Sequence, residues 1–317
     1  MKIIIFSLFI IGLSSCFDSN QVEIKKILSE SELGEKLFFD PILSHDKSIS
    51  CGSCHKPEFA FADNRSLSFG VNDSLGTRNT PSVMNMASRS HFFYDGRASS
   101  LEEQAIGPIE NPVEMNLSID SAVNRLLNSE LYVALFDKIY RDLPSKSNLT
   151  SALASFQRSL ESDGSAPHDL WMNDEEPLAL SKSQQRGREL FLEKAKCFDC
   201  HFGPDFTGDE FRNIGLYDGK EYTDKGRFDI TGDSNDLGKF KVPGLRNVAL
   251  TAPYMHDGSL ETLEEVIDFY NNLYRFVPAP INLDSVMIEP LMLSISEKED
   301  LVNFLHSLTD KNRYQIQ

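Results

Sequence analysis

The pattern Cys-x-x-Cys-His occurs twice in this 317-residue chain, at residues 51–55 and 197–201, and uses four of the five cysteines. Two thiols at this spacing form thioether bonds to a haem, and the histidine that follows is an axial ligand of its iron. A redox-active cysteine pair needs no such histidine, and a four-cysteine zinc site would not place one after each pair. The sequence therefore predicts two covalently bound c-type haems, held by Cys51, Cys54, His55, Cys197, Cys200 and His201.

The fifth cysteine, Cys16, follows a short charged start, a brief apolar run and a pair of small residues. This order is typical of a lipoprotein-type signal peptide over residues 1–15, with Cys16 as the lipidated N-terminus and residues 16–28 as a tether. An ordinary secretory peptide with an incidental cysteine is the alternative. Both alternatives predict export, and c-type haem is attached outside the cytoplasm. We therefore expect a periplasmic protein whose membrane contact is by the lipid anchor only.

The length and charge of the chain bound its class. About 300 mature residues are more than a single hydrophobic core usually organises, which suggests two domains. A formal net charge of −17 argues against nucleic acid or anionic lipid as a partner. It favours a basic or dipolar redox partner, although an acidic surface kept for solubility explains the charge equally well.

The elements that must position the two motifs are mainly helices. Amphipathic spacing and capping signals predict helices over approximately 31–39, 99–106, 118–140, 147–162, 182–194, 261–272 and 296–308, and a capping box is expected at Ser99 and Glu102. Strand-like alternation is scarce. Three stretches rich in Gly, Asn and Pro are too long for simple connections and are expected to wrap a ligand: 63–81, 107–116 and 203–247. A domain boundary near 163–175 predicts domains at 29–165 and 166–317, with one motif in each.

Several further motifs occur in order along the chain. In the first half they are Leu43-Ser44, Ser48-Ile49-Ser50-Cys51, Arg78-Asn79-Thr80-Pro81, Phe93-Tyr94-Asp95-Gly96-Arg97-Ala98, Leu101 to Ala105 and Gly107 to Met115. In the second half they are Phe240-Lys241-Val242-Pro243, Leu245-Arg246-Asn247 and Thr251 to Gly258. Together they resemble the bacterial dihaem cytochrome c peroxidase / MauG family over about residues 31–309. The resemblance implies a mostly α fold of two cytochrome c-like domains, each with one covalently bound haem. The first haem would be peroxidatic and the second would transfer electrons.

The resemblance also assigns an acid–base residue. Cleavage of peroxide at a haem needs an open axial position and a group that takes a proton from one oxygen and returns it to the other. Glu114 occupies the family's distal acid–base position, Gln104 would orient peroxide or water, and Pro108 would shape the pocket. Read without the family, Glu114 is a solvated loop acid. Arg97 is expected to be an ion-pair partner rather than a catalytic residue.

The chain departs from the better-known peroxidases at the ligand that closes the first haem. In those proteins a histidine after a glycine occupies this position until the second haem is reduced. Here Val71 follows Gly70, and residues 56–90 contain no histidine. His91 is the nearest alternative. The resemblance therefore implies an open first haem in the resting protein, as in the MauG-like branch.

For the second haem, the family's distal ligand follows the His-Asp-Gly loop and is Met in one branch and Tyr in the other. This chain offers Tyr270, with Met255 as the second choice and a simple packing role for Tyr270 as the alternative. A phenolate favours ferric and higher-valent iron, whereas a thioether favours ferrous iron. Tyr270 would therefore give the second haem a low potential.

Two more features lie between the haems in the family. Asn79, with the backbone carbonyls of Thr251 and Pro253, resembles its calcium site, because all three ligands are oxygen. Asn79 read alone is a turn residue. Tyr94 stands where the family usually has Trp, so that hole transfer between the haems would become coupled to loss of the phenol proton. Simple exchange of one aromatic residue for another is the alternative.

The predicted function is that of a dihaem cytochrome c peroxidase, which reduces hydrogen peroxide with electrons from a small donor protein such as a cytochrome c or cupredoxin. A MauG-like oxidase that uses high-valent haem to oxidise a protein or small molecule is the first alternative. A dihaem electron carrier is the second alternative, and it is disfavoured because a carrier needs neither an open iron nor Glu114. A homodimer is expected from the family.

Overall fold

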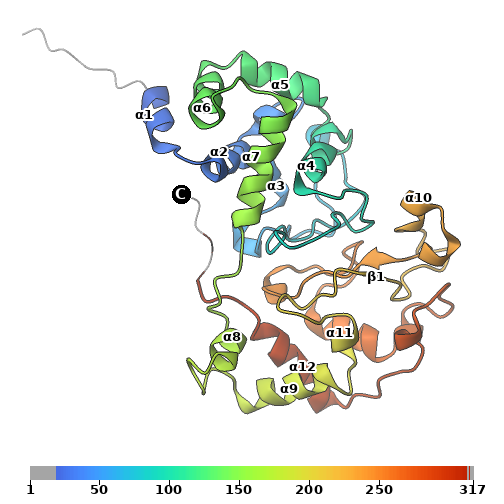
Figure 1. The fold of residues 1–317 in the computed structure, drawn as a ribbon. Helices are drawn as coiled ribbons and strands as arrows, with labels where there is room; N and C mark the ends of the chain where they lie inside the picture. The colour runs from blue at the N-terminus through green and yellow to red at the C-terminus, as the bar shows by residue number, and fades with distance from the viewer. Residues whose placement is uncertain (1–18, 313, 315–317) are drawn as a thin grey trace, which may run out of the picture.

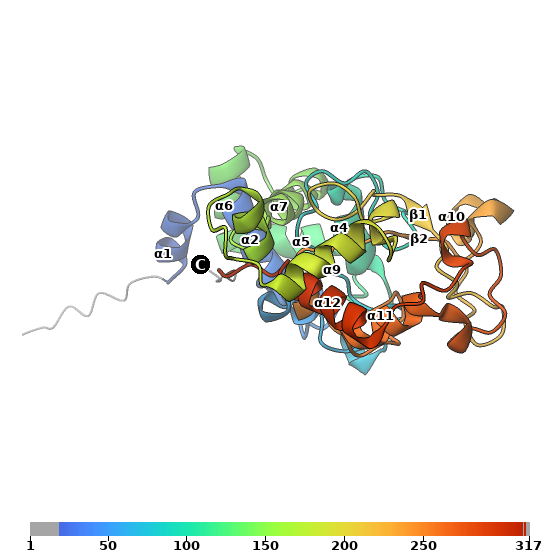
Figure 2. The same ribbon diagram turned by 90° about the horizontal axis from the view of Figure 1, so that it is seen from below.

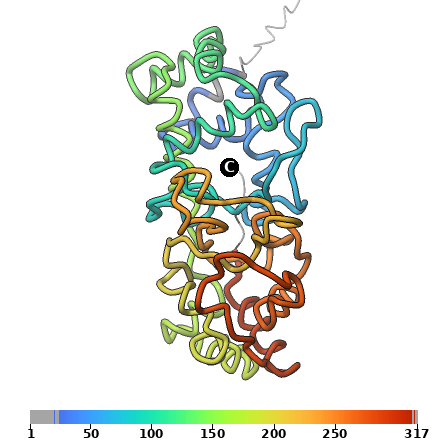
Figure 3. The backbone as a smooth tube through the Cα atoms, turned by 90° about the vertical axis from the view of Figure 1, so that its right-hand side faces the viewer, coloured from blue at the N-terminus to red at the C-terminus, as the bar shows by residue number. Residues whose placement is uncertain are grey.

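The computed structural model describes residues 19–312 and 314, which form two mainly helical lobes (Figure 1). The first lobe contains α1 to α7 and the second contains α8 to α12, and the two lie one above the other in Figure 3. The expected signal peptide and Cys16 lie outside the described residues.

The first lobe is built from short helices joined by turns. Its α-helices are α1 (Ser19–Lys26), α2 (Glu30–Phe39), α3 (Cys51–Cys54), α4 (Leu101–Glu110), α5 (Ile119–Leu127), α6 (Glu130–Tyr140) and α7 (Lys146–Ser159). Short 3-10 turns cover Pro41–Leu43, Pro57–Phe59 and Val71–Asp73.

The second lobe has the same character. Its helices are α8 (Pro167–Met172), α9 (Lys182–Leu192), α10 (Phe228–Thr231), α11 (Leu263–Asn271) and α12 (Ile295–His306). The strands β1 (Phe211–Arg212) and β2 (Phe240–Lys241) pair antiparallel, with Phe211 opposite Lys241. Short 3-10 turns cover Cys197–Asp199, Ser234–Asp236, Val248–Leu250, Leu273–Arg275 and Ser285–Met287.

In the first lobe, α2 crosses α7 at a glycine. A Cβ on Gly34 would lie 2.7 Å from the carbonyl carbon of Ala152 and 2.8 Å from the Cβ of Phe156, so only glycine allows this approach. The helix begins at Ser29, whose side chain accepts from Glu32 N–H while the Glu32 carboxylate accepts from Ser29 N–H. Phe38 and Phe156 pack edge to face, 5.1 Å apart, beneath the first Cys-x-x-Cys-His motif.

The second lobe repeats this arrangement with α9 and α12, which lie side by side in Figures 1 and 2. A Cβ on Gly187 would lie 2.6 Å from the carbonyl carbon of Asp300 and 2.8 Å from the Cβ of Phe304. Phe191 and Phe304 are 5.2 Å apart, in the positions that Phe38 and Phe156 have in the first lobe. The predicted fold of mostly α, cytochrome c-like domains is confirmed, and each is organised around one helix crossing.

Local details differ from the sequence-based expectations in two places. The capping residue of α4 is Ser100 rather than Ser99, because the Ser100 hydroxyl accepts from Glu103 N–H. The helix expected over 118–140 is broken into α5 and α6, since Ser129 caps a new helix by accepting from Tyr132 N–H.

The segment expected to be a tether is partly attached to the first lobe. The Lys138 ammonium of α6 donates to the carbonyls of Ile24 and Ile27 at 2.6 and 2.7 Å. Ile27 is 7% exposed and belongs to the first hydrophobic core. A free tether would therefore end before Ile24, because this part of the chain is packed. Within the described residues, no helix combines the length and the apolar character needed to cross a membrane.

Candidate functional site

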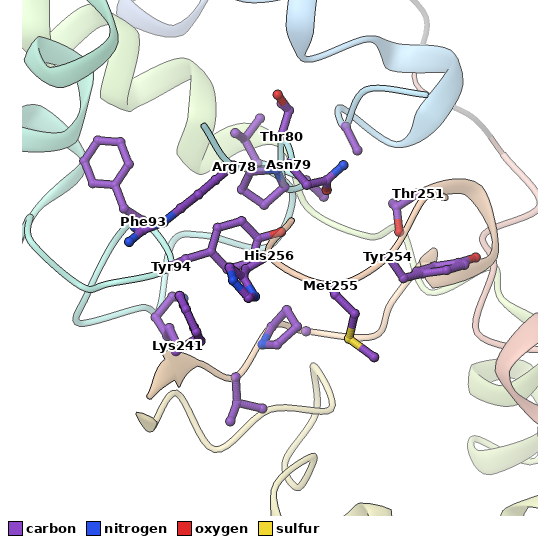
Figure 4. A pocket seen from close by; sticks show the side chains of 18 of the residues that line it. Arg78, Asn79, Thr80, Phe93, Tyr94, Lys241, Thr251, Tyr254, Met255 and His256 are labelled. Atoms are coloured by element: carbon purple, nitrogen blue, oxygen red, sulfur yellow. The ribbon is translucent and has the colours of Figure 1, made fainter. Parts of the chain in front are cut away.

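One cavity of about 990 Å³ reaches both Cys-x-x-Cys-His motifs. The motif residues on its wall are Cys51, Cys54, His55, Cys197, Cys200 and His201. Side chains from both lobes line this cavity, among them Tyr94 and Met255 (Figure 4). The fold therefore brings the two motifs, 146 residues apart in sequence, to a single site.

The two motif histidines are oriented in the same way. Nδ1 of His55 lies 2.9 Å from the carbonyl oxygen of Phe61, and Nδ1 of His201 lies 2.8 Å from that of Phe206. A carbonyl only accepts, so Nδ1 carries the proton in both rings and Nε2 keeps its lone pair. Burial lowers the pKa of both imidazoles, which keeps them neutral. Each ring is thus set up to bind iron through Nε2.

The motif thiols complete the fit to two c-type haems. Burial raises the pKa of the Cys51 and Cys197 thiols to about 12 each. Unreactive, apolar thiols beside an oriented imidazole, on the wall of a cavity this large, match thioether attachment better than a redox-active cysteine pair. The residues present therefore fit the group that the motifs imply.

Above the first motif, α4 presents one face to the cavity. Gln104 and Pro108, four residues apart, both line it, as do Leu101 and Ala105. Glu114 follows in the turn after α4, where its N–H donates to the carbonyl of Asn111 at 3.0 Å. The three residues predicted for peroxide chemistry, Glu114, Gln104 and Pro108, therefore lie on one wall.

The Glu114 carboxyl is half-buried and has a raised pKa. Burial is the main cause, and a hydrogen bond from Asn111 and the charge of Arg97 oppose it. The Arg97 guanidinium is itself paired with the Asp95 carboxylate at 2.8 Å and lies 3.5 Å from the centre of the Phe93 ring. Arg97 thus has the ion-pair geometry expected for it. A carboxyl with a pKa above its ordinary value is suited to both accept and donate a proton.

Val71, the residue that the family resemblance aligns with a closing histidine, is 1% exposed. Its N–H donates to the carbonyl of Glu114 at 2.8 Å, which fixes the loop against the distal wall. His91 contacts the Ser90 hydroxyl at 3.0 Å and the ring of Phe211. The histidines on the cavity wall, within the part of the chain that is described, are His55, His201 and His256.

On the second side of the cavity, Tyr270 and Met255 both line the wall. Burial raises the pKa of the Tyr270 phenol, and the charges of Cys200 and Cys197 act in the same direction. Met255 precedes His256 with a left-handed φ of 72°. Both candidate ligands therefore face the cavity that contains the second motif, and the choice between them stays a prediction.

Between the motifs, Tyr94 and His256 lie close together (Figure 4). Burial raises the pKa of the Tyr94 phenol, the charge of Asp257 adds to this effect, and Arg78 opposes it. Arg78 pairs with Asp95 of the first lobe at 2.6 Å and with Asp224 of the second lobe at 2.7 Å. This ion-pair network holds the two lobes together around Tyr94.

The predicted calcium ligands Asn79, Thr251 and Pro253 all line the cavity. The Asn79 side-chain amide donates to the carbonyls of Arg65 and Ser66 at 3.1 and 3.3 Å. Its amide oxygen is thereby turned away from those carbonyls. The position is compatible with a cation, and calcium at this point stays a prediction.

Two features of the site were not anticipated from the sequence. Asn111, the only side-chain hydrogen-bond donor to Glu114 among the described residues, donates to its Oε1 at 2.6 Å. Asp224, from the long 203–247 segment, joins the lobes through Arg78. The Asn-x-x-Glu spacing at 111–114 is a detectable signal for the first contact. The pairing of Arg78 with Asp224 has no local sequence signal.

Comparisons with known proteins show the family to which this chain is similar. A family model described as di-haem cytochrome c peroxidase matches residues 29–177. The methylamine utilization protein MauG of Methylorubrum extorquens is 40% identical over 278 residues, covering 87% of this chain and 77% of that protein. The cytochrome c551 peroxidase of Nitrosomonas europaea is 38% identical over 243 residues, covering 75% of this chain and 71% of that protein.

Solved structures are similar over nearly the whole chain. A MauG-like protein associated with microbial copper homeostasis has a TM-score of 0.80 and 33% identity, covering 91% of this chain and 92% of that chain. The diheme peroxidase BthA of Burkholderia thailandensis has a TM-score of 0.78 and 26% identity, covering 89% and 86%.

Proposed function

Because this chain belongs to the dihaem cytochrome c peroxidase / MauG family, whose members are oxidoreductases with two haem c groups, we propose that it reduces hydrogen peroxide at an open first haem. Cys51, Cys54 and His55 would hold this haem, and Cys197, Cys200 and His201 would hold the second. The proposal includes reaction with peroxide in the fully oxidised protein, without prior reduction of the second haem.

The observation that carries the proposal is the position of Val71. Its backbone N–H donates to the Glu114 carbonyl and its side chain is buried, so this position offers no iron ligand and instead holds Glu114, the acid–base residue of the proposal, at the cavity wall. A haem held by Cys51, Cys54 and His55 would supply the redox-active iron for the reaction with peroxide. The Glu114 carboxylate takes a proton from one peroxide oxygen and returns it to the other, while Gln104 orients the molecule.

The overall reaction consumes two electrons and two protons for each peroxide and releases two waters. The electrons come from an external donor, for which a small cytochrome c or a cupredoxin is suited. Tyr94, between the two motifs, would relay oxidising equivalents from one haem to the other. Burial and Asp257 raise the pKa of its phenol, so we expect the neutral phenol to give up its proton when oxidised.

A second candidate is a MauG-like oxidase that takes the two electrons from a protein or small molecule. The observation that favours it is Tyr270, which lines the same cavity as Cys197 and Cys200. As a phenolate ligand it would stabilise oxidised iron and make the second haem a poor acceptor from a small cytochrome. Met255 as ligand would favour the peroxidase instead.

We also propose a cellular location, a domain organisation, a calcium site and an oligomeric state for the protein. The protein would be periplasmic and anchored through lipid on Cys16, with haem domains at 29–165 and 166–317. Calcium would bind at Asn79, Thr251 and Pro253, between the lobes. A homodimer is proposed from the family.

The experiment that tests the function is stopped-flow mixing of the oxidised protein with peroxide. Glu114→Gln removes the proton carrier and should slow the reaction by roughly 100-fold or more, the usual scale of general acid–base catalysis. Glu58→Gln, which changes an exposed carboxylate near the first motif, is the matched control and should react normally. A normal rate for Glu114→Gln would exclude the mechanism. Steady-state oxidation of reduced cytochrome c by peroxide then favours the peroxidase over the oxidase.

A further inference from the structure

We propose that Asn111 is a positioning residue that holds one carboxylate oxygen of Glu114, Oε1, and thereby leaves the other oxygen, Oε2, to carry the proton to and from peroxide. The proposal rests on the function proposed above for Glu114. It assigns different tasks to the two oxygens of one carboxylate.

The orientation of the Asn111 amide is determined by its neighbours. Its Oδ1 accepts from the N–H of Val113 at 3.1 Å, and its Nδ2 donates to Oε1 of Glu114 at 2.6 Å. A rotated amide would place Oδ1 against the carboxylate and Nδ2 against an N–H group, so both contacts would become repulsive. The amide donor therefore faces Glu114.

The backbone of Asn111 is attached to the end of α4. Its N–H donates to the Gly107 carbonyl at 2.9 Å, and its own carbonyl accepts from Glu114 and Asn116 at 3.0 Å each. The same helix carries Gln104 and Pro108 on the cavity wall. Asn111 thus couples the position of the Glu114 carboxylate to the helix that shapes the rest of the distal side.

The loop of Gly70 and Val71 holds Glu114 from the opposite side. Val71 N–H donates to the Glu114 carbonyl at 2.8 Å, and Gly70 lies so close that a Cβ on it would be 2.7 Å from the Glu114 Cα. The backbone and Oε1 of Glu114 are both restrained, while no side chain in the described part of the protein donates to Oε2. Oε2 is the oxygen left to exchange a proton.

The charges around Glu114 define the effect of removing Asn111. Burial raises the pKa of Glu114, and the Asn111 hydrogen bond is the main effect that opposes burial, ahead of the charge of Arg97. The charge of Glu114 raises the pKa of the Cys51 and Cys54 thiols, but these sulfurs would be neutral thioethers with haem attached. Loss of the amide donor therefore destabilises the carboxylate form, and the base needed to deprotonate peroxide appears only at higher pH.

The test compares pH profiles of the peroxide reaction in haem-loaded Asn111→Ala and Asn111→Asp. In the pH–rate profile of Asn111→Ala, the fall in rate on the acid side should occur at a pH about one to two units higher. This shift corresponds to the loss of one hydrogen bond to a charged group. Asn111→Asp keeps the size of the side chain and an acceptor for Val113 N–H, so it guards against misfolding. Its added negative charge should move the acid side of the pH–rate profile to a still higher pH. Asn116→Asp, an exposed change two residues after Glu114, is the charge control.

A second measurement does not depend on turnover. Infrared titration of the ferric protein should show a carboxyl band that is absent in Glu114→Gln and that titrates at higher pH in both Asn111 variants. The proposal would be overturned if the Asn111 variants kept both the native pH–rate profile and the native titration of the infrared band. A rate loss that is equal at every pH would also overturn it. A normal reaction of Glu114→Gln with peroxide would instead refute the proposed function itself, on which the role of Asn111 depends.

Discussion

Gly70→Ala should displace Glu114 without changing any residue that touches peroxide. Gly70 has φ −94° and ψ −162°, a backbone conformation that alanine also adopts, so the substitution adds no backbone strain. The added Cβ would lie 2.6 Å from the Glu114 carbonyl oxygen and 2.7 Å from its Cα, with the Val113 carbonyl closer still. The contact is with backbone, which cannot rotate away as a side chain can.

The size of the effect follows from these distances. An ordinary carbon–carbon contact needs about 3.5 Å or more, so the loop and the Glu114 backbone must separate by roughly 1 Å. A displacement of about 1 Å in a catalytic group costs on the order of 100-fold in rate. Overpacking of this kind also destabilises the fold by about 1–3 kcal/mol.

The assay is stopped-flow reduction of peroxide by the oxidised protein, with haem content and urea unfolding measured in parallel. Gly76→Ala in the same loop is the matched control, because the nearest atom to its Cβ would be the Ser68 carbonyl oxygen at 3.4 Å. It should react like the native protein. A native rate in Gly70→Ala, with both haems attached, would refute the idea that the loop positions Glu114.

Two further predictions concern the second lobe. If Tyr270 is the distal ligand of the second haem, Tyr270→Phe should replace the low-spin signal of that haem with a high-spin signal or with the signal of a new ligand. Met255→Ala should leave the optical and EPR spectra unchanged. The reverse result would assign Met255 as the ligand. Gly187→Ala should force α9 from α12, because its Cβ would lie 2.6 Å from the Asp300 carbonyl carbon, and should lower the free energy of unfolding by about 1–3 kcal/mol. An unchanged urea midpoint would contradict that tight crossing.

Features with a short-range signal were predictable from the sequence. The haem motifs, the scarcity of strands and most helices follow from residue spacing, and the structure has α2, α7, α9, α11 and α12 near the expected positions. Errors came where adjacent residues compete for one role, as at Ser99 and Ser100, since both hydroxyls can cap a helix. The break between α5 and α6 likewise depended on whether Ser129 would cap a new helix.

Contacts between distant segments were not predictable. The helix crossings at Gly34 and Gly187 depend on packing against residues more than 100 positions away. The Arg78–Asp224 ion pair joins the lobes across 146 residues. The choice between Tyr270 and Met255 also depends on how two loops pack around a haem, and both residues reach the cavity. The family resemblance predicted Glu114 as the distal acid. The hydrogen bond to it from Asn111 became evident only in the structure.

The most direct test of an open first haem is an EPR spectrum of the fully oxidised protein. With Val71 buried and bound to the Glu114 backbone, we expect one high-spin ferric signal from the first haem and one low-spin signal from the second. The same sample should react with peroxide at once. Two low-spin signals, with a reaction that begins only after one-electron reduction, would contradict the account.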